Sequence, residues 1–205
     1  MESKLTLQRT GSRRVAPRKP SAQNGQALVL RVELRDSDPL IYRTLLVPAN
    51  ITLRKLHITL LWGMGWVGGH LHEFIINDTH YGEPNPDYPE PDLRNEQRVR
   101  LDKALGSKRT FDYIYDYGDA WWHRVKLIER MPFLGPLDCP WCLDGANACP
   151  PEDVGGIPGY EEFRAIVADP AHPRHDDLMQ WYGGPFDPAA FNLDEVNQRL
   201  MEIRL

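Results

Sequence analysis

The fold of this chain is decided by the stretch Phe111-Asp-Tyr-Ile-Tyr-Asp-Tyr-Gly-Asp-Ala-Trp-Trp-His-Arg-Val-Lys-Leu-Ile128. Aromatic and aliphatic residues alternate with polar ones on both sides of Tyr117-Gly118-Asp119, which is typical of two strands joined by a reversal or a bulge. In the second half, every second residue falls on one largely apolar face: Trp121, His123, Val125 and Leu127. The stretch therefore predicts a hairpin-like unit with one buried face.

The segments before this unit predict a β-hairpin and a helix. Residues 27–34 carry leucine or valine at every second position, and residues 40–47 supply the partner strand, which Pro48 ends. Thr52 is a suitable N-cap for a helix that has leucines at three- and four-residue spacings. Gly63 and Gly65 are expected to end this helix.

The next segments add a strand and a long loop. Residues 71–76 predict a third strand, which would add to the first hairpin. The order strand, strand, helix, strand is typical of an α+β fold in which the helix covers one face of the sheet. Residues 81–96 contain four prolines, which lack a backbone donor, so we expect a long surface loop there. Residues 99–105 are compatible with a short strand or with a turn of helix.

The C-terminal third predicts a loop followed by short helices. Residues 132–159 are rich in proline and glycine and contain the cysteines, which predicts an ordered loop. Short helices are expected over residues 159–168 and 176–182. A last helix begins at the N-cap Asn192, with Glu195 three positions later in a capping-box arrangement.

Length and composition agree with one soluble domain. The chain has 205 residues, of which 41% are hydrophobic and 26% charged, so a single core is feasible. We expect one compact α+β domain over residues 25–205, with a hairpin, helix and strand core, a further antiparallel strand pair and short C-terminal helices. No apolar run approaches the roughly 20 residues of a membrane helix, and no signal peptide is visible. We therefore expect a cytoplasmic protein without membrane contact.

Charge is distributed unevenly along the chain. Residues 1–20 contain six basic residues and one acidic residue, whereas the whole chain has a net charge of −5. We expect residues 1–24 to form a basic, disordered arm, which is either a solvated leader or a local contact to nucleic-acid phosphates. The acidic remainder argues against non-specific nucleic-acid binding over the main surface.

Four motifs together resemble the plasmid pRiA4b ORF-3-like family, which includes passenger proteins of IS1096-type insertion elements. The motifs are Ile41-Tyr-Arg43 with Trp62-Gly63-Met64, Tyr115-Asp-Tyr-Gly-Asp-Ala-Trp-Trp-His123, Ala148-Cys-Pro-Pro-Glu-Asp-Val-Gly-Gly156 with Gly159-Tyr160, and Phe186-Asp-Pro188. The resemblance covers nearly everything after the arm. It implies a compact cytoplasmic α+β domain, often found near plasmids or mobile elements, and it supplies no biochemical activity.

The three cysteines of the chain, Cys139, Cys142 and Cys149, lie within eleven positions of one another. The spacing of the first two allows both thiolates to face one tetrahedral ion from a single turn, so zinc is the candidate cofactor. The fourth ligand would be water or one of four residues: His123, Asp153, His172 and His175. The alternative is that small buried thiols pack a loop.

A second candidate site lies in the Tyr117-Gly118 turn. Asp116, Asp119 and His123 come together if this turn folds the strand back on itself. Carboxylates and an imidazole on one rim suit metal binding or general acid–base chemistry. The alternative is that both carboxylates satisfy backbone donors of the turn and that His123 is a half-buried strand residue.

The loop Pro150-Pro-Glu-Asp-Val-Gly-Gly156 combines rigidity with two carboxylates and two glycines. Glu152 and Asp153 suit the binding of a cation or of a basic partner. Alternatively, Asp153 caps backbone amides while Gly155 and Gly156 adopt positive φ angles. Four aromatic residues are candidates for a cluster beneath this loop, as core or as a stacking platform: Trp121, Trp141, Tyr160 and Trp181.

The sequence leaves three hypotheses for function open. The first is a non-enzymatic binding or accessory protein of a plasmid or mobile element, with a protein or nucleic-acid partner, because no complete catalytic constellation is visible. The second is a metal-dependent, hydrolase-like enzyme that uses the carboxylates of the turn and the loop together with His123. The third is that both motifs only determine the fold. If the Asp116–His123 turn and the Pro150–Gly156 loop line the same cleft, a functional site is favoured over a purely structural role.

Overall fold

The predicted hairpin forms the middle of an eight-stranded sheet. The computed structural model describes residues 25–205 except 88, 134 and 136. Strands β6 (Thr110–Tyr115) and β7 (Trp121–Phe133) pair antiparallel, with Tyr115 opposite Trp121 and Tyr113 opposite His123. The four residues predicted to share the apolar face of β7 are all buried, so the hairpin and its buried face are confirmed.

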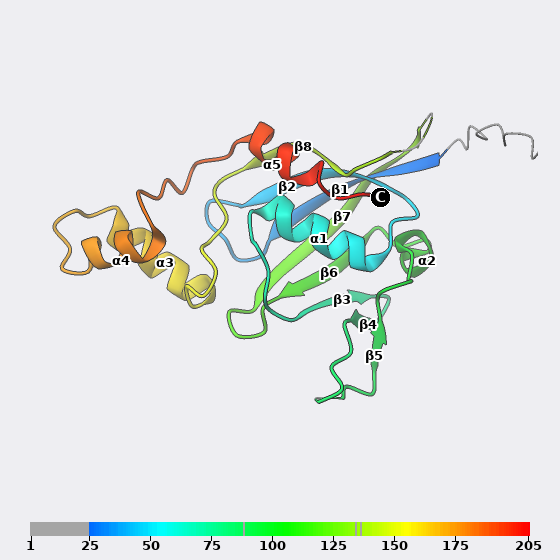
Figure 1. Cartoon of the computed structure of the whole chain (residues 1–205), viewed down its shortest axis with the longest axis horizontal. Coiled ribbons are helices and arrows are strands. Elements are labelled where there is room, and N and C mark those ends of the chain that lie inside the picture. Colours follow the sequence, from blue (N-terminus) through cyan, green and yellow to red (C-terminus); the bar gives the residue numbers. More distant parts are fainter. Residues whose placement is uncertain (1–24, 88, 134, 136) are drawn as a thin grey trace, which may run out of the picture.

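The strands follow the order β5-β4-β3-β6-β7-β1-β2-β8 across the sheet (Figure 1). All neighbours are antiparallel except β4 and β5. The remaining strands are β1 (Gly25–Leu34), β2 (Tyr42–Pro48), β3 (His72–Ile76), β4 (Thr79–Gly82), β5 (Leu93–Asn95) and β8 (Trp141–Ala146). The predicted β1–β2 hairpin is confirmed, and the long strand β7 joins it to β6 by pairing with both β1 and β6.

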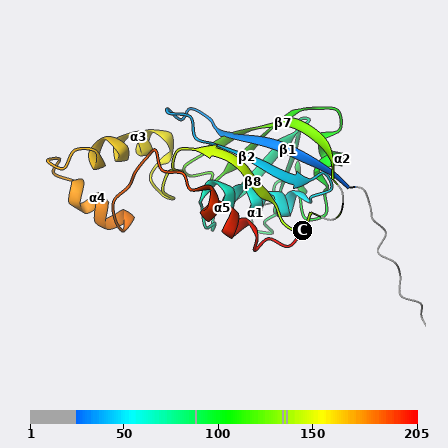
Figure 2. The same cartoon turned by 90° about the horizontal axis from the view of Figure 1, so that it is seen from above.

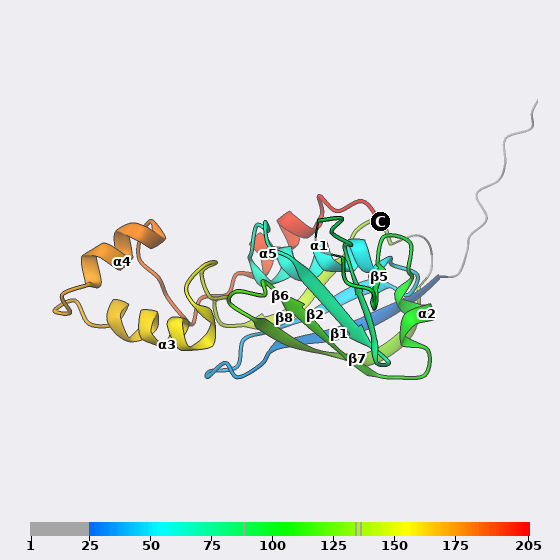
Figure 3. The same ribbon diagram turned by 90° about the horizontal axis from the view of Figure 1, so that it is seen from below.

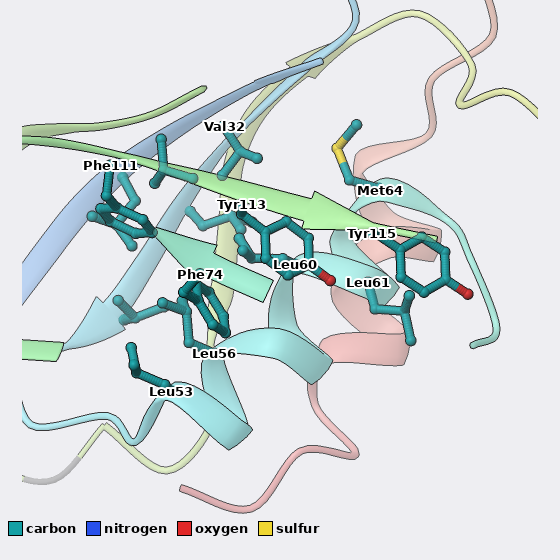
Figure 4. Packing of buried hydrophobic residues seen from close by; sticks show 14 of the residues in the cluster. Val32, Leu53, Leu56, Leu60, Leu61, Met64, Phe74, Phe111, Tyr113 and Tyr115 are labelled. Atoms are coloured by element: carbon teal, nitrogen blue, oxygen red, sulfur yellow. The ribbon is translucent and has the colours of Figure 1, made fainter. Parts of the chain in front are cut away.

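Two helices, α1 (Leu53–Met64) and α5 (Leu193–Leu200), lie on the same face of the sheet (Figure 2). Helix α1 begins as predicted, because the Thr52 hydroxyl accepts a 3.3 Å hydrogen bond from the backbone N–H of Lys55. It ends before Gly65, whose φ of +121° favours glycine. Figure 4 shows the leucines of α1 packed against the aromatic side chains of β3 and β6. This layer forms the hydrophobic core.

Helix α5 protects the edge strand β8. Asn192 Oδ1 accepts hydrogen bonds from the backbone N–H groups of Asp194 and Glu195, which confirms the predicted N-cap. Farther along the helix, the Asn197 side chain accepts a 2.7 Å hydrogen bond from Cys142 N and donates a 3.0 Å bond to Cys142 O. The Asn197 amide thus replaces part of a neighbouring strand at an edge that would otherwise expose unpaired backbone groups.

The other helices lie at opposite ends of the molecule. Helices α3 (Gly156–Val167) and α4 (His175–Tyr182) project beyond the end of the sheet (Figure 3). They pack through an aromatic cluster in which Phe163 contacts Trp181, Tyr182 and Phe186 edge-on or tilted. The short helix α2 (Leu101–Leu105) occupies the segment that the sequence left open between strand and helix.

Three details of the predicted fold are corrected. Strand β3 does not add to the first hairpin: it pairs with β4 and β6, because β7 and β8 already occupy the free edges of β1 and β2. The loop predicted over residues 132–159 contains strand β8, which forms because β2 offers that edge. The ends of the loop predicted over residues 81–96 belong to β4 and β5, while its four prolines lie outside both strands.

The predicted arm, residues 1–24, lies outside the described residues. Within the described part of the chain, no helix has the length and apolar character needed to cross a membrane. The structure is an α+β domain built on one mixed sheet, in agreement with the predicted fold class.

Candidate metal centre

The β6–β7 turn uses one carboxylate oxygen of Asp116 and leaves the other free of the turn. Asp116 has a φ of +58°, and its Oδ1 accepts hydrogen bonds from the backbone N–H groups of Gly118 at 2.8 Å and Asp119 at 3.4 Å. This use of Oδ1 is the local role that the sequence offered as the alternative. The second oxygen, Oδ2, takes no part in the turn and lies 3.5 Å from His70 Nδ1.

Glu152 holds the segment between α1 and β3 in place. Its carboxylate accepts 3.3 Å hydrogen bonds from the backbone N–H groups of Val67 and Gly68, and a 2.5 Å bond from the Tyr115 hydroxyl. Burial and the Glu152 charge raise the pKa of Tyr115, so the hydroxyl keeps its proton and donates. The position of the segment that carries His70 therefore depends on the loop that carries Glu152.

The same loop contacts the β6–β7 turn through its glycines. Asp119 Oδ2 accepts a 3.2 Å hydrogen bond from Gly155 N. Gly156 has a φ of +68°, and a Cβ atom there would lie 2.5 Å from the Asp119 carbonyl oxygen. Only glycine allows this approach, so the predicted positive φ angles at Gly155 and Gly156 serve to seat the loop on the turn.

These contacts bring one imidazole and two carboxylates together. His70 Nδ1 lies 3.5 Å from Asp116 Oδ2, and His70 Nε2 lies 3.5 Å from Asp153 Oδ1. One ligand atom from each residue falls within 4.8 Å of the others. The Asp116 side chain is 9% exposed, that of His70 31% and that of Asp153 72%, so the group opens to solvent on one side. Hereafter the His70–Asp116–Asp153 group, a candidate site for a cation, is called the metal centre.

The remaining site residues predicted from the sequence divide into two sets. Asp119, Glu152, Gly155 and Gly156 position the loops around the metal centre, as described above. Three others lie in the core: Trp121, His123 and Tyr160. His123 is fully buried beside Trp66 and Tyr113, so it is not on the rim with Asp116 and Asp119. Burial lowers the pKa of its imidazole to about 4.

The cysteines do not form the predicted cluster of ligands. Within the described residues, the three thiols make up no group whose ligand atoms approach as closely as those of the metal centre. Cys142 lies buried in β8, where its thiol donates a 3.4 Å hydrogen bond to the Asp144 carbonyl. Burial raises the pKa of both the Cys142 and the Cys149 thiol.

His70 is the member of the metal centre that the sequence analysis missed. It follows Gly68 and Gly69 in the short connection between α1 and β3. A histidine after two glycines in such a connection was the available signal, because glycines allow the backbone to approach other loops closely. Its two partners come from distant segments of the chain, and local periodicity contains no information about that contact.

The composition of the metal centre favours a divalent cation. Imidazole nitrogen and carboxylate oxygen suit Zn²⁺, Mn²⁺ or Fe²⁺, and three protein ligands leave coordination positions open. The neighbouring carboxylates Asp119 and Glu152 add negative charge. Together with the carboxylates of Asp116 and Asp153 they make four. Among the described residues, no lysine or arginine forms an ion pair with any of these four carboxylates.

Comparisons with known proteins place the chain in a family. The family model described as Plasmid pRiA4b ORF-3-like protein matches residues 26–195. The uncharacterised protein y4hQ of Sinorhizobium fredii is 38% identical over 178 residues, which are 85% of this chain and 90% of that protein. The crystal structure of a protein of unknown function, MM3350 from Methanosarcina mazei Go1, superposes with a TM-score of 0.74 at 30% identity, covering 84% of this chain and 98% of that one. The chain therefore belongs to the plasmid pRiA4b ORF-3-like protein family.

Proposed function

We propose that the protein is a metal-binding accessory protein, in which His70, Asp116 and Asp153 hold one divalent cation. The observation that carries this proposal is the convergence of three ligand atoms from three separate segments to within 4.8 Å. The distances of 3.5 Å between His70 and each carboxylate are longer than ordinary hydrogen bonds. An ion bound here would take one nitrogen of His70 and one oxygen of each aspartate, and so would replace one of these loose contacts with coordinate bonds.

The way the loops are fixed supports a built site. Glu152, Gly155 and Gly156 hold the three segments together without using any atom of the metal centre. A functional site needs its ligand-bearing segments held in place by supporting residues, and these three residues supply such support. The cation would cross-link the loops further and so present a defined surface to a partner.

The partner in this proposal is a protein or a nucleic acid, and the plasmid in the family description supports a place among plasmid or mobile-element genes. The basic residues of the arm would supply a salt-dependent contact if the partner is a nucleic acid. All three cysteines are free thiols, which supports a reducing compartment such as the cytoplasm.

A second candidate function is a metal-dependent hydrolase. The exposure of Asp153 favours it, because a cation held partly by an exposed ligand remains open to water. A cation with an open position can activate a bound water molecule for attack on an ester or phosphoester.

Thermal unfolding with and without Mn²⁺ tests the proposal. Mn²⁺ is the suitable probe because it prefers oxygen and nitrogen ligands, so the cysteine thiols contribute little. At about one hundred times the dissociation constant, Mn²⁺ should raise the melting temperature by roughly 5–10 °C relative to protein in EDTA. The His70→Gln variant should lose this shift, whereas His80→Gln, which removes a histidine paired with Glu73 on the surface, should keep it.

The absence of any Mn²⁺-dependent shift in the wild-type protein would overturn the proposal, and so would a full shift in His70→Gln. The same experiment with Zn²⁺ tests the cysteine hypothesis separately. A Zn²⁺ shift that persists in His70→Gln and disappears in Cys142→Ser would assign zinc to the cysteines instead.

A further inference from the structure

A cavity of about 490 Å³ lies between the C-terminal end of α1 and helix α5. Arg43 of β2 forms part of its wall, and Trp62 and Phe191 supply two aromatic rings. The cavity shares no residue with the metal centre. Its volume lies within the range of pockets that bind small molecules in proteins. The cavity is therefore a second candidate binding site, separate from the one described above.

Hydrogen bonds join Arg43 to the end of α1. The residue is only 3% exposed, and its guanidinium donates from Nε to the Gly63 carbonyl at 3.0 Å and from Nη2 to the Met64 carbonyl at 3.4 Å. A guanidinium has five N–H donors, and all of those of Arg43 meet neutral carbonyl oxygens. The other three acceptors are the carbonyls of Tyr42, Ala146 and Asn147.

The buried charge of Arg43 has no carboxylate partner within the described part of the chain. Burial lowers the pKa of this guanidinium, as expected for a positive charge that is removed from water. A buried charge is costly unless an opposite charge lies near it. The macrodipole of α1 places roughly half a negative charge at the carbonyls of the helix end, which offsets only part of the guanidinium charge.

Arg199 of α5 adds a second positive charge with unused donors. It donates to the carbonyls of Gly65 at 3.1 Å and Trp66 at 3.3 Å, so three of its five N–H groups have no acceptor among the described residues. The acidic residue of the wall is Glu195, whose Oε1 accepts a 2.7 Å hydrogen bond from Asn192 Nδ2. One carboxylate and one helix end do not offset two guanidinium groups, so the cavity is net positive although the whole chain carries a net charge of −5.

The aromatic rings form the apolar part of the cavity. Arg43 Cζ lies 4.5 Å from the centroid of the Phe191 ring. Gly145 makes this position of the ring possible, because a Cβ there would lie 2.6 Å from Phe191 Cζ. Trp62 is half-buried and packs against the hydrophobic core while it also lines the cavity. Aromatic walls of this kind favour a planar ring as the apolar part of a ligand.

We propose that this cavity binds a small molecule that carries a planar aromatic or heteroaromatic ring and one anionic group, either a carboxylate or a phosphate. The anionic group accepts hydrogen bonds from the unused donors of Arg199 and offsets the charge of Arg43. The ring packs against Trp62 and Phe191. Because the metal centre contributes no residue to the cavity, this inference goes beyond the proposed function.

Titration calorimetry of the full-length protein in EDTA tests the proposal with two matched pairs of probes. The first pair is 2-naphthoate and its neutral amide, and the second is adenosine monophosphate and adenosine. The ring is the same within each pair, and only the anionic group differs. At least one anionic probe should bind about tenfold more tightly than its neutral partner, because that partner leaves the Arg199 donors without a charged acceptor. Preference for the naphthoate assigns a carboxylate ligand, and preference for the nucleotide assigns a phosphate ligand.

Two variants identify the place of binding. Arg199→Gln and Trp62→Leu should each weaken the binding of the anionic probe by about tenfold. The matched controls are Arg98→Gln and Trp141→Leu, which change exposed residues outside the cavity and should leave the affinity unchanged. Arg43 is kept intact, since the loss of its five hydrogen bonds would disturb the fold.

The comparison of charged and neutral probes uses only the wild-type protein, so it does not depend on the folding of any variant. Equal affinity within both pairs, or no binding of either anionic probe at millimolar concentration, would overturn the proposal. Unchanged affinity in folded Arg199→Gln or in folded Trp62→Leu would also overturn it. His70→Gln should bind the probes as the wild type does, so a failure of this proposal is distinguishable from a failure of the metal centre.

Discussion

The Tyr115 hydroxyl donates a 2.5 Å hydrogen bond to Glu152 Oε1, and this contact joins the central hairpin to the loop that follows β8. The same carboxylate accepts from the backbone of Val67 and Gly68. One side chain therefore ties together the three segments that carry His70, Asp116 and Asp153. The geometry of the metal centre depends on a residue that contributes no atom to it.

Removal of the Glu152 carboxylate should destabilise the fold. Glu152→Ala leaves two backbone donors and one tyrosine hydroxyl without their acceptor, which should lower the free energy of unfolding by about 2–3 kcal/mol. Urea denaturation measures this loss. Glu162→Ala is the matched control, because that side chain is 62% exposed and, among the described residues, forms its ion pair with Arg174 at the surface. Equal losses in the two variants would contradict the account.

The two glycines that seat the loop should differ in their tolerance of alanine. A Cβ at Gly155 would meet no atom closer than 3.6 Å, so Gly155→Ala should lose only the roughly 1–2 kcal/mol of a left-handed backbone. A Cβ at Gly156 would lie 2.5 Å from the carbonyl of Asp119, and backbone atoms cannot move aside cheaply. Gly156→Ala should therefore show the lower melting temperature, and the reverse order would mean that the loop does not rest on the turn.

Buried histidines should make the protein less stable in acid. Burial lowers the pKa of His123 from 6.5 to about 4 and that of His57 to about 2. Below pH 6.5 the unfolded chain binds protons that the folded chain excludes, so the free energy of unfolding falls as the pH falls. Each such histidine contributes a slope of about 1.4 kcal/mol per pH unit until its folded pKa is reached.

The variant His123→Phe, which keeps a flat ring in the core, should reduce the slope of stability against pH by this amount between about pH 6 and pH 4.5. The contribution of His57 should remain. Urea denaturation at a series of pH values measures the slope, and His80→Gln is the control for loss of a partly exposed histidine outside the core. An unchanged slope in His123→Phe would contradict this, because it would show that His123 in the folded protein binds its proton as readily as in the unfolded chain.

Local patterns in the sequence predicted the hairpins and the helix caps, and they singled out Asp116 and Asp153, which the structure brings near His70, as candidate site residues. Alternation predicted the strands because a strand exposes every second residue to the same environment, and Asp116 and Asp153 stood out as carboxylates beside glycine turns. The pairing of β3 was not predictable, because it depends on which sheet edges other strands have already filled. His70 was missed for a related reason: its partners are brought to it by tertiary contacts of Glu152.

His123 shows how proximity along the chain can mislead. It follows Asp119 by four positions, which suggested a shared rim. However, the alternation of β7 places His123 on the same face as Trp121, and that face lies against the core. The alternation of apolar and polar residues along the strand already predicted that His123 faces the core. Inside a strand, this alternation decides which way a side chain points, whatever residues lie near it in the sequence.

Titration calorimetry of Mn²⁺ into three proteins tests the central claim most directly. Asp116 and Asp78 are both turn aspartates with φ angles near +58° and +57°, so Asp116→Asn and Asp78→Asn are matched substitutions. Asparagine at position 116 can still accept the hydrogen bond of Gly118, which preserves the turn while the charge is removed. The account predicts one bound ion in the wild type and in Asp78→Asn, and loss of binding in Asp116→Asn. Wild-type protein that binds no Mn²⁺, or Asp116→Asn that binds as the wild type does, would contradict it.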